Sequence, residues 1–412
     1  MTLGHVCNSV QVMNFLQKII NTKSCTALIL SGGLLIGNII YFPNYCYAKS
    51  MSVSAYIEAV KKSIKDKNYD EAIEFCNTVL KINPNSVEAY NQRGNAKRLQ
   101  GKYREAIEDY SKAIELNPNR QNLYYNRGLA KSYLEEYEGV IEDYTKELEI
   151  NSSNANAYLN RGTVEVILKK YDDAICDFSK FIEIDSKSEI AYYNRGIAKR
   201  NKGDYKGAIE DYNTVIALNP ENIDAYNNRG VAKYYLKDYQ GAVEDYTKVI
   251  DSGTDLAKAY YNRGMAYFGI KKYEQAIEDF TYTLELSSNN EHAYYNRGLS
   301  QEMLGNNKSA IDDYSKAIEL NPNNDEYYYH RGYLYSKTEE IQKALSDIEK
   351  SITINNKDSE KYLIRAIIYC KVGQYLPAVD DLNIYLKTNP DNNQAIELRS
   401  FAIQSIEGEL KD

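Results

Sequence analysis

Residues 87–120 read VEAYNQRGNAKRLQGKYREAIEDYSKAIELNPNR, and the pattern returns in residues 189–222 as EIAYYNRGIAKRNKGDYKGAIEDYNTVIALNPEN. Each stretch contains the dipeptide Arg-Gly, which recurs at intervals of 34 residues. It occupies positions 93–94, 127–128, 161–162, 195–196, 229–230, 263–264, 297–298 and 331–332. A tyrosine lies four residues before each glycine, and an alanine usually lies twelve residues after it. A fixed period of this length is typical of a chain built from repeated structural units.

Each period predicts two helices joined by a short turn. In the first stretch, apolar residues recur at helical spacing over residues 87–99 and again over 103–116, with Gly101 between them. Gly94 and Ala106 carry little or no side chain, and we expect them to let the two helices approach closely. One such hairpin cannot bury both of its faces, so neighbouring hairpins must stack. The sequence therefore predicts an all-α fold.

The motif resembles the tetratricopeptide repeat (TPR). The resemblance rests on Tyr90, Gly94, Ala106, Tyr110, Ala113 and Pro118 at their spacing in a 34-residue period. It covers residues 53–392 as ten units, which start at residues 53, 87, 121, 155, 189, 223, 257, 291, 325 and 359. The resemblance implies a right-handed superhelix, or α-solenoid, of about ten helix pairs. Residues 393–412 hold one more amphipathic segment, which we expect to be the C-terminal solvating helix that caps such arrays.

The first fifty residues differ from the rest of the chain. They carry Lys18, Lys23 and Lys49 but no acidic residue, and residues 26–42 are uncharged and mostly apolar. A basic start, an apolar middle and small residues at the end are the parts of a secretory signal, here with cleavage near Ala48. The rival interpretation is an uncleaved membrane anchor through residues 26–42 that holds the repeats outside the cytoplasm. A third interpretation is that residues 26–42 form a buried core helix. We expect an exported protein, periplasmic or secreted, or a membrane-anchored one.

Composition argues against several classes of function. The formal net charge is −8, whereas a nucleic-acid-binding protein needs a basic stripe, so no nucleic-acid partner is expected. His292 and His330 lie 38 residues apart with no third ligand in view, so neither a metal nor another cofactor is expected. No nucleophile motif or phosphate-binding loop is present, and outside the repeats and residues 1–50 there is no room for a catalytic domain. We therefore expect no enzymatic activity.

The arginine before each glycine has an aspartate sixteen residues after it. Examples are Arg127 with Asp143, Arg195 with Asp211, and Arg263 with Asp279. One interpretation is a row of ligand-binding charges in the groove. The interpretation we favour is a structural pair that ties one helix to the next, because the planar guanidinium group matches a carboxylate.

Two further rows on the first helix are candidates for ligand contact. The first consists of Asn126, Asn160, Asn194, Asn228, Asn262 and Asn296. The second consists of Tyr125, Tyr193, Tyr261, Tyr295 and Tyr329. Amides both donate and accept hydrogen bonds, and tyrosines offer rigid binding surface with a polar tip. The alternatives are that the asparagines bond their own or neighbouring helices and that the tyrosines fill the seams between helices.

These features lead to one functional hypothesis and one alternative. The hypothesis is a non-catalytic scaffold that binds a protein or an extended peptide along its concave groove. The lysines of the carboxylate clamp found in some TPR proteins are replaced here, for example by Tyr125 and Asn227, so that specific partner is not expected. The alternative is a structural role, in which solenoids of this chain associate with one another in the cell envelope.

Overall fold

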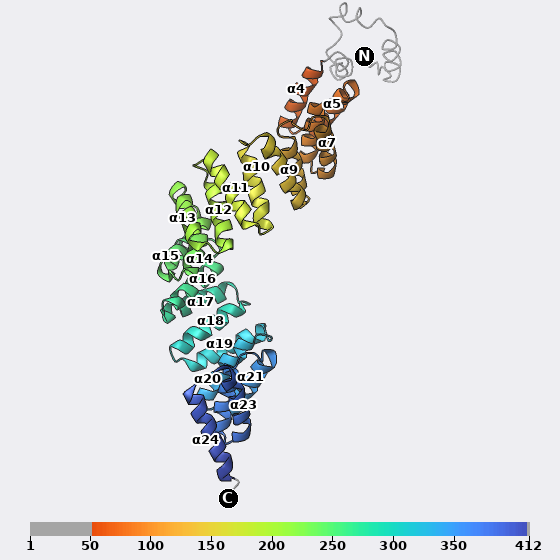
Figure 1. The fold of residues 1–412 in the computed structure, drawn as a ribbon. Helices are drawn as coiled ribbons and strands as arrows, with labels where there is room; N and C mark the ends of the chain where they lie inside the picture. Colours follow the sequence, from red (N-terminus) through yellow and green to blue (C-terminus); the bar gives the residue numbers. More distant parts are fainter. Residues whose placement is uncertain (1–51, 410–412) are drawn as a thin grey trace, which may run out of the picture. The chain divides into compact units, whose positions relative to one another are not determined.

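The computed structural model describes residues 52–409, and every regular element in that range is an α-helix. The chain divides into two compact units at Asn151, so the described residues form a first unit of 52–151 and a second of 152–409. The all-α fold of tandem helix pairs is thereby confirmed (Figure 1). The predicted signal or anchor in residues 1–50 lies outside the described residues.

The helices follow the 34-residue period throughout. The first unit contains α4 (Val53–Lys65), α5 (Tyr69–Ile82), α6 (Val87–Leu99), α7 (Tyr103–Leu116), α8 (Leu123–Ser132) and α9 (Tyr137–Ile150). The second unit contains α10 (Ala155–Ile167), α11 (Tyr171–Ile184), α12 (Glu189–Lys202), α13 (Tyr205–Leu218), α14 (Ile223–Tyr235), α15 (Tyr239–Asp251), α16 (Leu256–Gly269), α17 (Tyr273–Leu286), α18 (Glu291–Met303), α19 (Asn307–Leu320), α20 (Asp325–Lys337), α21 (Ile341–Ile354), α22 (Glu360–Lys371), α23 (Tyr375–Thr388) and α24 (Asn393–Glu409).

Polar side chains cap many of the first helices. The Ser86 hydroxyl accepts a hydrogen bond from the Ala89 amide at 3.2 Å, and Asn222 Oδ1 accepts one from the Ala225 amide at 2.9 Å. Such a cap satisfies one of the backbone N–H groups that a helix start leaves without a partner. The sequence therefore marks where these helices begin.

The turn inside each pair requires one residue in the left-handed conformation. All ten pairs have a positive φ at the same place in the period, at residues 67, 101, 135, 169, 203, 237, 271, 305, 339 and 373. Four of these residues are glycine, which adopts that conformation without strain, and the others are lysine or glutamate. The predicted role of Gly101 thus extends to a backbone position shared by every repeat.

In most repeats the glycine of the Arg-Gly dipeptide packs against an aromatic ring of the second helix, and in the repeat 325–358 Gly332 packs against Ile348. A Cβ atom added at Gly94 would lie 2.7 Å from Cε1 of Tyr110, and one at Gly264 would lie 2.9 Å from Cε1 of Phe280. The expectation that Gly94 serves a close approach to Ala106 was therefore incomplete. The small residue makes room for a fully buried ring from the second helix.

We expect Gly264→Ala to destabilise the protein by about 1–2 kcal/mol. Alanine normally stabilises a helix interior by about 1 kcal/mol relative to glycine, but here its methyl group would collide with Phe280 in a filled core. Urea denaturation followed by circular dichroism measures the change. Gly408→Ala is the control, because nothing lies within 4 Å of the added atom in α24. Equal midpoints for the two variants would contradict the packing argument.

Contacts two helices apart indicate which side of each unit is inner. Within the second unit α12 contacts α14 and α14 contacts α16, and in the first unit α4 contacts α6. The substantial contacts of this kind in the described chain all join first helices. Within each unit, first helices therefore lie closer together than second helices, so their exposed side is the inner side of the curve.

The array ends with the single helix α24. Ala395 and Ala402 are buried against the preceding pair, whereas Phe401 is 52% exposed. Arg399 donates from Nη1 to Asn383 Oδ1 at 3.1 Å, sixteen residues earlier. This geometry agrees with a helix that covers the last pair. No helix in residues 52–409 is long and apolar enough to cross a membrane.

Candidate functional site

Positions within a repeat are counted from its first residue, so Tyr193, Asn194 and Arg200 hold positions 5, 6 and 12 of the repeat 189–222. We call the exposed side of the first helices, formed by positions 5, 6, 9 and 12, the first-helix face. This face contains both rows of predicted contact residues. The arginines at position 7 fix the helices on which that face is built.

The structure brings each position-7 arginine together with its aspartate. Arg195 Nη2 donates to Asp211 Oδ1 at 2.7 Å and Arg195 Nε donates to Oδ2 at 3.0 Å. Arg127 with Asp143 and Arg263 with Asp279 form the same fork, with nitrogen–oxygen distances of 2.6–3.2 Å. The aspartates are buried, with exposed fractions of 0–3% for these three. The fork is therefore inside the repeat and not on a ligand-binding surface.

The same arginines also reach back to the preceding repeat. Arg195 Nη1 donates to the Ser179 hydroxyl at 3.0 Å, and Arg263 Nη1 donates to the Thr247 hydroxyl at 3.1 Å. Each guanidinium group thus joins its own first helix to two second helices. Its Cζ atom also lies over the ring of the tyrosine at position 4, as for Arg195 over Tyr192 at 5.3 Å from the ring centroid. These contacts support the structural interpretation of the arginine series.

A lysine at position 11 adds a second cation to several of these aspartates. Lys97, Lys131, Lys199 and Lys233 each place Nζ 2.9 Å from the buried aspartate of their repeat. In the repeat 155–188 this position is Glu165, which is 5% exposed and has no hydrogen-bond partner at Oε2. Burial and the neighbouring charge of Asp177 raise the pKa of Glu165 to about 7.

Three members of the asparagine row are bonded to the preceding repeat. Asn228 Nδ2 donates to the Tyr193 hydroxyl at 2.9 Å, and Asn296 Nδ2 donates to the Tyr261 hydroxyl at 3.0 Å. Asn126 Nδ2 donates to Asn91 Oδ1 at 3.0 Å. In every case position 6 bonds position 5 of the repeat before it, 35 residues earlier. At these sites the asparagine has a structural partner.

Two members of the row remain open. No hydrogen bond joins the side chain of Asn194 or Asn262 to another residue in the range 52–409, and both are half-buried. The residue 35 positions before Asn194, where the engaged asparagines find their hydrogen-bond acceptor, is Leu159, which has no polar side-chain atom. Asn160 is half-buried and is not free. The structure thus divides a row that is uniform in sequence into engaged and open members.

The tyrosine row lies partly in the seams between helices. Tyr193 and Tyr261 are half-buried, and their rings contact Tyr212 and Phe280 with centroids 6.1 and 5.8 Å apart. Tyr125 contacts Tyr144 at 5.6 Å, Tyr295 contacts Tyr314 at 5.8 Å, and Tyr329 contacts His330 at 5.3 Å. Burial raises the pKa of Tyr329 to about 12 and also raises that of Tyr261. All five side chains of the row are half-buried.

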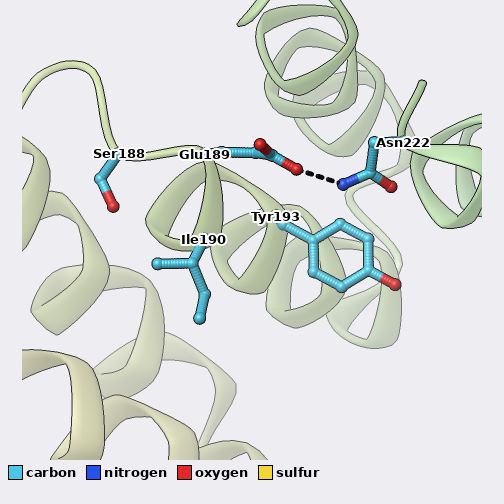
Figure 2. A pocket seen from close by; sticks show the side chains of 5 residues that line it. All are labelled: Ser188, Glu189, Ile190, Tyr193 and Asn222. Atoms are coloured by element: carbon cyan, nitrogen blue, oxygen red, sulfur yellow. Dashed lines mark hydrogen bonds between the residues drawn. The ribbon is translucent and has the colours of Figure 1, made fainter. Parts of the chain in front are cut away.

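A hollow lies at the start of α12 beside this row. It is lined by Ser188, Glu189, Ile190, Tyr193 and Asn222 (Figure 2). Asn222 Nδ2 donates to Glu189 Oε1 at 2.5 Å across the hollow, and the Ile190 side chain is 53% exposed. The hollow combines an exposed apolar side chain with a hydrogen-bonded pair of polar side chains.

The residues at position 12 of the first helices also make contacts between repeats, which the sequence pattern did not indicate. Arg200 Nη1 donates to Asn228 Oδ1 at 2.6 Å, and Glu302 Oε2 lies 3.2 Å from His330 Nδ1. One signal in the sequence sets Arg200 apart. Each arginine of the Arg-Gly series has an aspartate sixteen residues later, whereas Arg200 has Ile216 there and so lacks that acidic partner. Within residues 52–409, no three His, Cys, Asp or Glu side chains are placed to hold a metal ion.

Comparison with protein families identifies repeats along the chain. Models described as tetratricopeptide repeats match residues 63–86, 87–120, 223–252, 257–290, 292–324 and 314–346, and a model described as a TPR repeat matches residues 198–237. No curated protein matches the sequence.

Many solved structures are similar. A tetratricopeptide repeat protein from Parabacteroides merdae is 23% identical, with a TM-score of 0.43, over 60% of this chain and 98% of its own. MamA from Desulfovibrio magneticus is 24% identical, with a TM-score of 0.40, over 40% of this chain and 94% of its own. YrrB, described as a TPR protein with an unusual peptide-binding site, is 21% identical, with a TM-score of 0.40, over 45% of this chain and 95% of its own.

Proposed function

Because the chain belongs to the tetratricopeptide repeat family, we propose that it is a non-catalytic scaffold that binds a protein or an extended peptide along its first-helix face. The observation that carries this proposal is the pair of open amides at Asn194 and Asn262, each next to a half-buried tyrosine. A half-buried amide without a partner has hydrogen bonds left to make. A peptide backbone offers both the donors and the acceptors that such an amide needs.

The spacing of the open amides suits an extended peptide. Asn194 lies on α12 and Asn262 on α16, with α14 in contact with both helices. Packed helices lie about 8–10 Å apart, so two steps cover about 16–20 Å. An extended chain rises about 3.3 Å per residue, so five or six peptide residues would connect the two amides. Tyr193 and Tyr261 would then flank the backbone with rigid, partly exposed rings.

The test compares open and engaged asparagines. A partner captured by crosslinking in the native organism is identified and purified, and its affinity is measured for each variant. We expect Asn194→Ala with Asn262→Ala to weaken binding about tenfold or more while helicity and melting temperature stay unchanged. The control Asn228→Ala should instead lower stability, because it removes the hydrogen bonds of Asn228 with Tyr193 and with Arg200.

Two results would count against this proposal. Wild-type affinity in the double variant would place binding elsewhere on the molecule. Capture of nothing but further copies of the chain, with a mass that rises with concentration, would favour the structural, self-associating role instead.

We further propose that the repeats act outside the cytoplasm, after export or on a membrane tether. The support is the basic start, the uncharged run of residues 26–42 and the small residues that end at Ala48. Cell fractionation with N-terminal sequencing of the mature chain tests this. A soluble chain that begins near Lys49 supports cleavage, a membrane-bound chain that retains its N-terminus supports the anchor, and an intact chain in the cytoplasm contradicts both.

A further inference from the structure

The repeat 189–222 contains a buried hydroxyl group with no partner. Tyr212 is 0% exposed, and its hydroxyl makes no hydrogen bond. Leaving a buried polar group unpaired costs about 1–3 kcal/mol. The same position holds Phe178 and Phe280 in two other repeats, so a ring without the hydroxyl fits this core. The hydroxyl of Tyr212 is thus not needed for packing.

Another repeat shows what this hydroxyl bonds when a partner is present. At position 24 of the repeat 291–324, the Tyr314 hydroxyl donates to Glu302 Oε2 at 2.6 Å. Glu302 holds position 12, which is Arg200 in the repeat 189–222. The chain therefore satisfies the equivalent hydroxyl with a carboxylate in one repeat and replaces that carboxylate by a cation in the other.

Arg200 in turn has no anion. Its guanidinium group donates to Asn228 Oδ1 at 2.6 Å and to Asn201 Oδ1 at 3.1 Å, which are both neutral acceptors. In the described part of the chain no carboxylate lies within ion-pair distance of Arg200. The buried Asp211 of the same repeat is paired with Arg195 and Lys199 instead. A guanidinium group has five N–H donors, so several remain for a ligand.

Tyr193 completes the cluster from the side of the hollow. Its hydroxyl accepts from Asn228, which leaves its own proton free to donate. Burial raises the pKa of Tyr193 and of Tyr212. The positive charge of Arg200 offsets part of this rise in both residues. Asn228 bonds both Arg200 and the Tyr193 hydroxyl, and the Tyr193 ring lies 6.1 Å from that of Tyr212, so the three side chains form one cluster. Both tyrosines are therefore neutral donors near one cation.

We propose that Arg200, Tyr212 and Tyr193 form a subsite for a carboxylate of the bound peptide. The inference rests on the proposed binding function and names one feature of its ligand. The carboxylate would accept from the guanidinium group and from the two hydroxyl groups, as Glu302 accepts from Tyr314. It could belong to an aspartate or glutamate side chain or to a peptide C-terminus. Charge-assisted hydrogen bonds of this kind are about twice as strong as neutral ones.

The acidic groups nearby leave this subsite available. Glu189 is eleven residues before Arg200 on α12, about 16 Å along the helix, and its carboxylate accepts from Asn219 and Asn222. Burial raises the pKa of Tyr193, and the negative charge of Asp224 raises it further. A ligand carboxylate would therefore be repelled by Glu189 at one end of the hollow in Figure 2 and attracted to Arg200, which gives the bound peptide a direction.

The first test uses decapeptide mixtures and the full chain. One mixture has glutamate fixed at a central position with an amidated C-terminus, a second has glutamine there, and a third has glutamine with a free C-terminus. Fluorescence polarisation gives the affinities. We expect the wild type to prefer the glutamate mixture or the free C-terminus over the amidated glutamine mixture by about tenfold. The arm that binds identifies the source of the carboxylate.

The variants separate this subsite from general charge effects. Arg200→Gln should remove the preference, and Tyr212→Phe should reduce it severalfold without loss of thermal stability, because no hydrogen bond is lost. Lys206→Gln, which removes an exposed positive charge from α13 of the same repeat, should leave the preference intact. Measurable but equal binding of all three mixtures by the wild type, or an unchanged preference in Arg200→Gln, would overturn the subsite.

A second probe keeps the inference distinct from the proposed function. N-acetylglutamate, which carries two carboxylates, and N-acetylglutaminamide, which carries none, are added to the full chain, and the Nε–H resonance of Arg200, assigned from the Arg200→Gln spectrum, is followed by NMR. A shift with the acid but not with the amide supports the carboxylate subsite even if no peptide mixture binds, in which case only the proposed peptide function fails. No difference between the two compounds overturns the subsite.

Discussion

Asp245→Ala is expected to destabilise the protein by about 3–5 kcal/mol. Asp245 is 2% exposed and accepts from Arg229 Nη2 at 2.6 Å and from Nε at 3.0 Å, while Lys233 Nζ lies 2.9 Å away. Removing one partner of a buried pair leaves the other charges poorly compensated, which costs far more than the pair itself contributes. Two cations lose their anion here, so the effect should exceed that of an ordinary core substitution.

The unfolding curve should also change shape. In a solenoid each repeat contacts only its neighbours, so a weak inner repeat can separate the transitions of the segments on either side. Urea denaturation followed by circular dichroism should therefore show a lower first midpoint and a broader or two-step transition. The comparison variant is Glu183→Ala, which removes an exposed ion pair with Lys180 and should change stability by less than about 1 kcal/mol. A similar small change for Asp245→Ala would show that the forks contribute little.

Glu165→Lys should stabilise the protein by about 3 kcal/mol or more at pH 8. Four other repeats have a lysine at this position, each 2.9 Å from a buried aspartate. In the wild type a carboxylate at position 165 is instead buried near Asp177, and only Oε1 approaches Arg161, at 4.0 Å. The substitution replaces repulsion by a pair that the fold already accommodates.

The pH dependence separates the charge effect from a packing effect. Burial and Asp177 raise the pKa of Glu165 from 4.5 to about 7 in the folded chain. Below about pH 4.5 the group is protonated in both states and has no effect. As the pH rises from there to about 7, the unfolded chain releases its proton first, so the wild type loses about 3 kcal/mol of stability. Above pH 7 the loss is complete.

Glu165→Gln should therefore have the same free energy of unfolding as the wild type near pH 4 and a higher one above pH 7. Chemical denaturation at a series of pH values, with each variant compared to the wild type, isolates this one group from the other carboxyls. Glu183→Gln provides the control at an exposed site, since Glu183 is paired with Lys180 in solvent. A constant difference between Glu165→Gln and the wild type at all pH values would mean that Glu165 is not charged differently in the two states.

The period of 34 residues was sufficient to place the helices. The predicted segments 87–99 and 103–116 are the observed α6 and α7. Local signals explain this success, because caps, the left-handed turn residue and helical apolar spacing all act within a few residues of the chain. The Arg–Asp spacing also predicted the forks, because two residues sixteen positions apart lie at the same pair of places on two adjacent helices in every repeat.

What the sequence by itself determined is therefore the repeat: its helices, its turns and the forks that join them, all of which depend on positions close in the chain or fixed by the period. What only the tertiary structure decided is which side chains of each row are free. Asn228 is engaged because Tyr193, 35 residues earlier, presents a hydroxyl, whereas Asn194 is open because Leu159 does not. Tyr212 lacks a partner because position 12 of its repeat is Arg200, which has no acceptor atom and bonds Asn228 in the next repeat, whereas the repeat of Tyr314 has Glu302 there. The physical reason is that a hydrogen bond depends on the residue facing the side chain across the interface between repeats, which the pattern within one repeat does not specify.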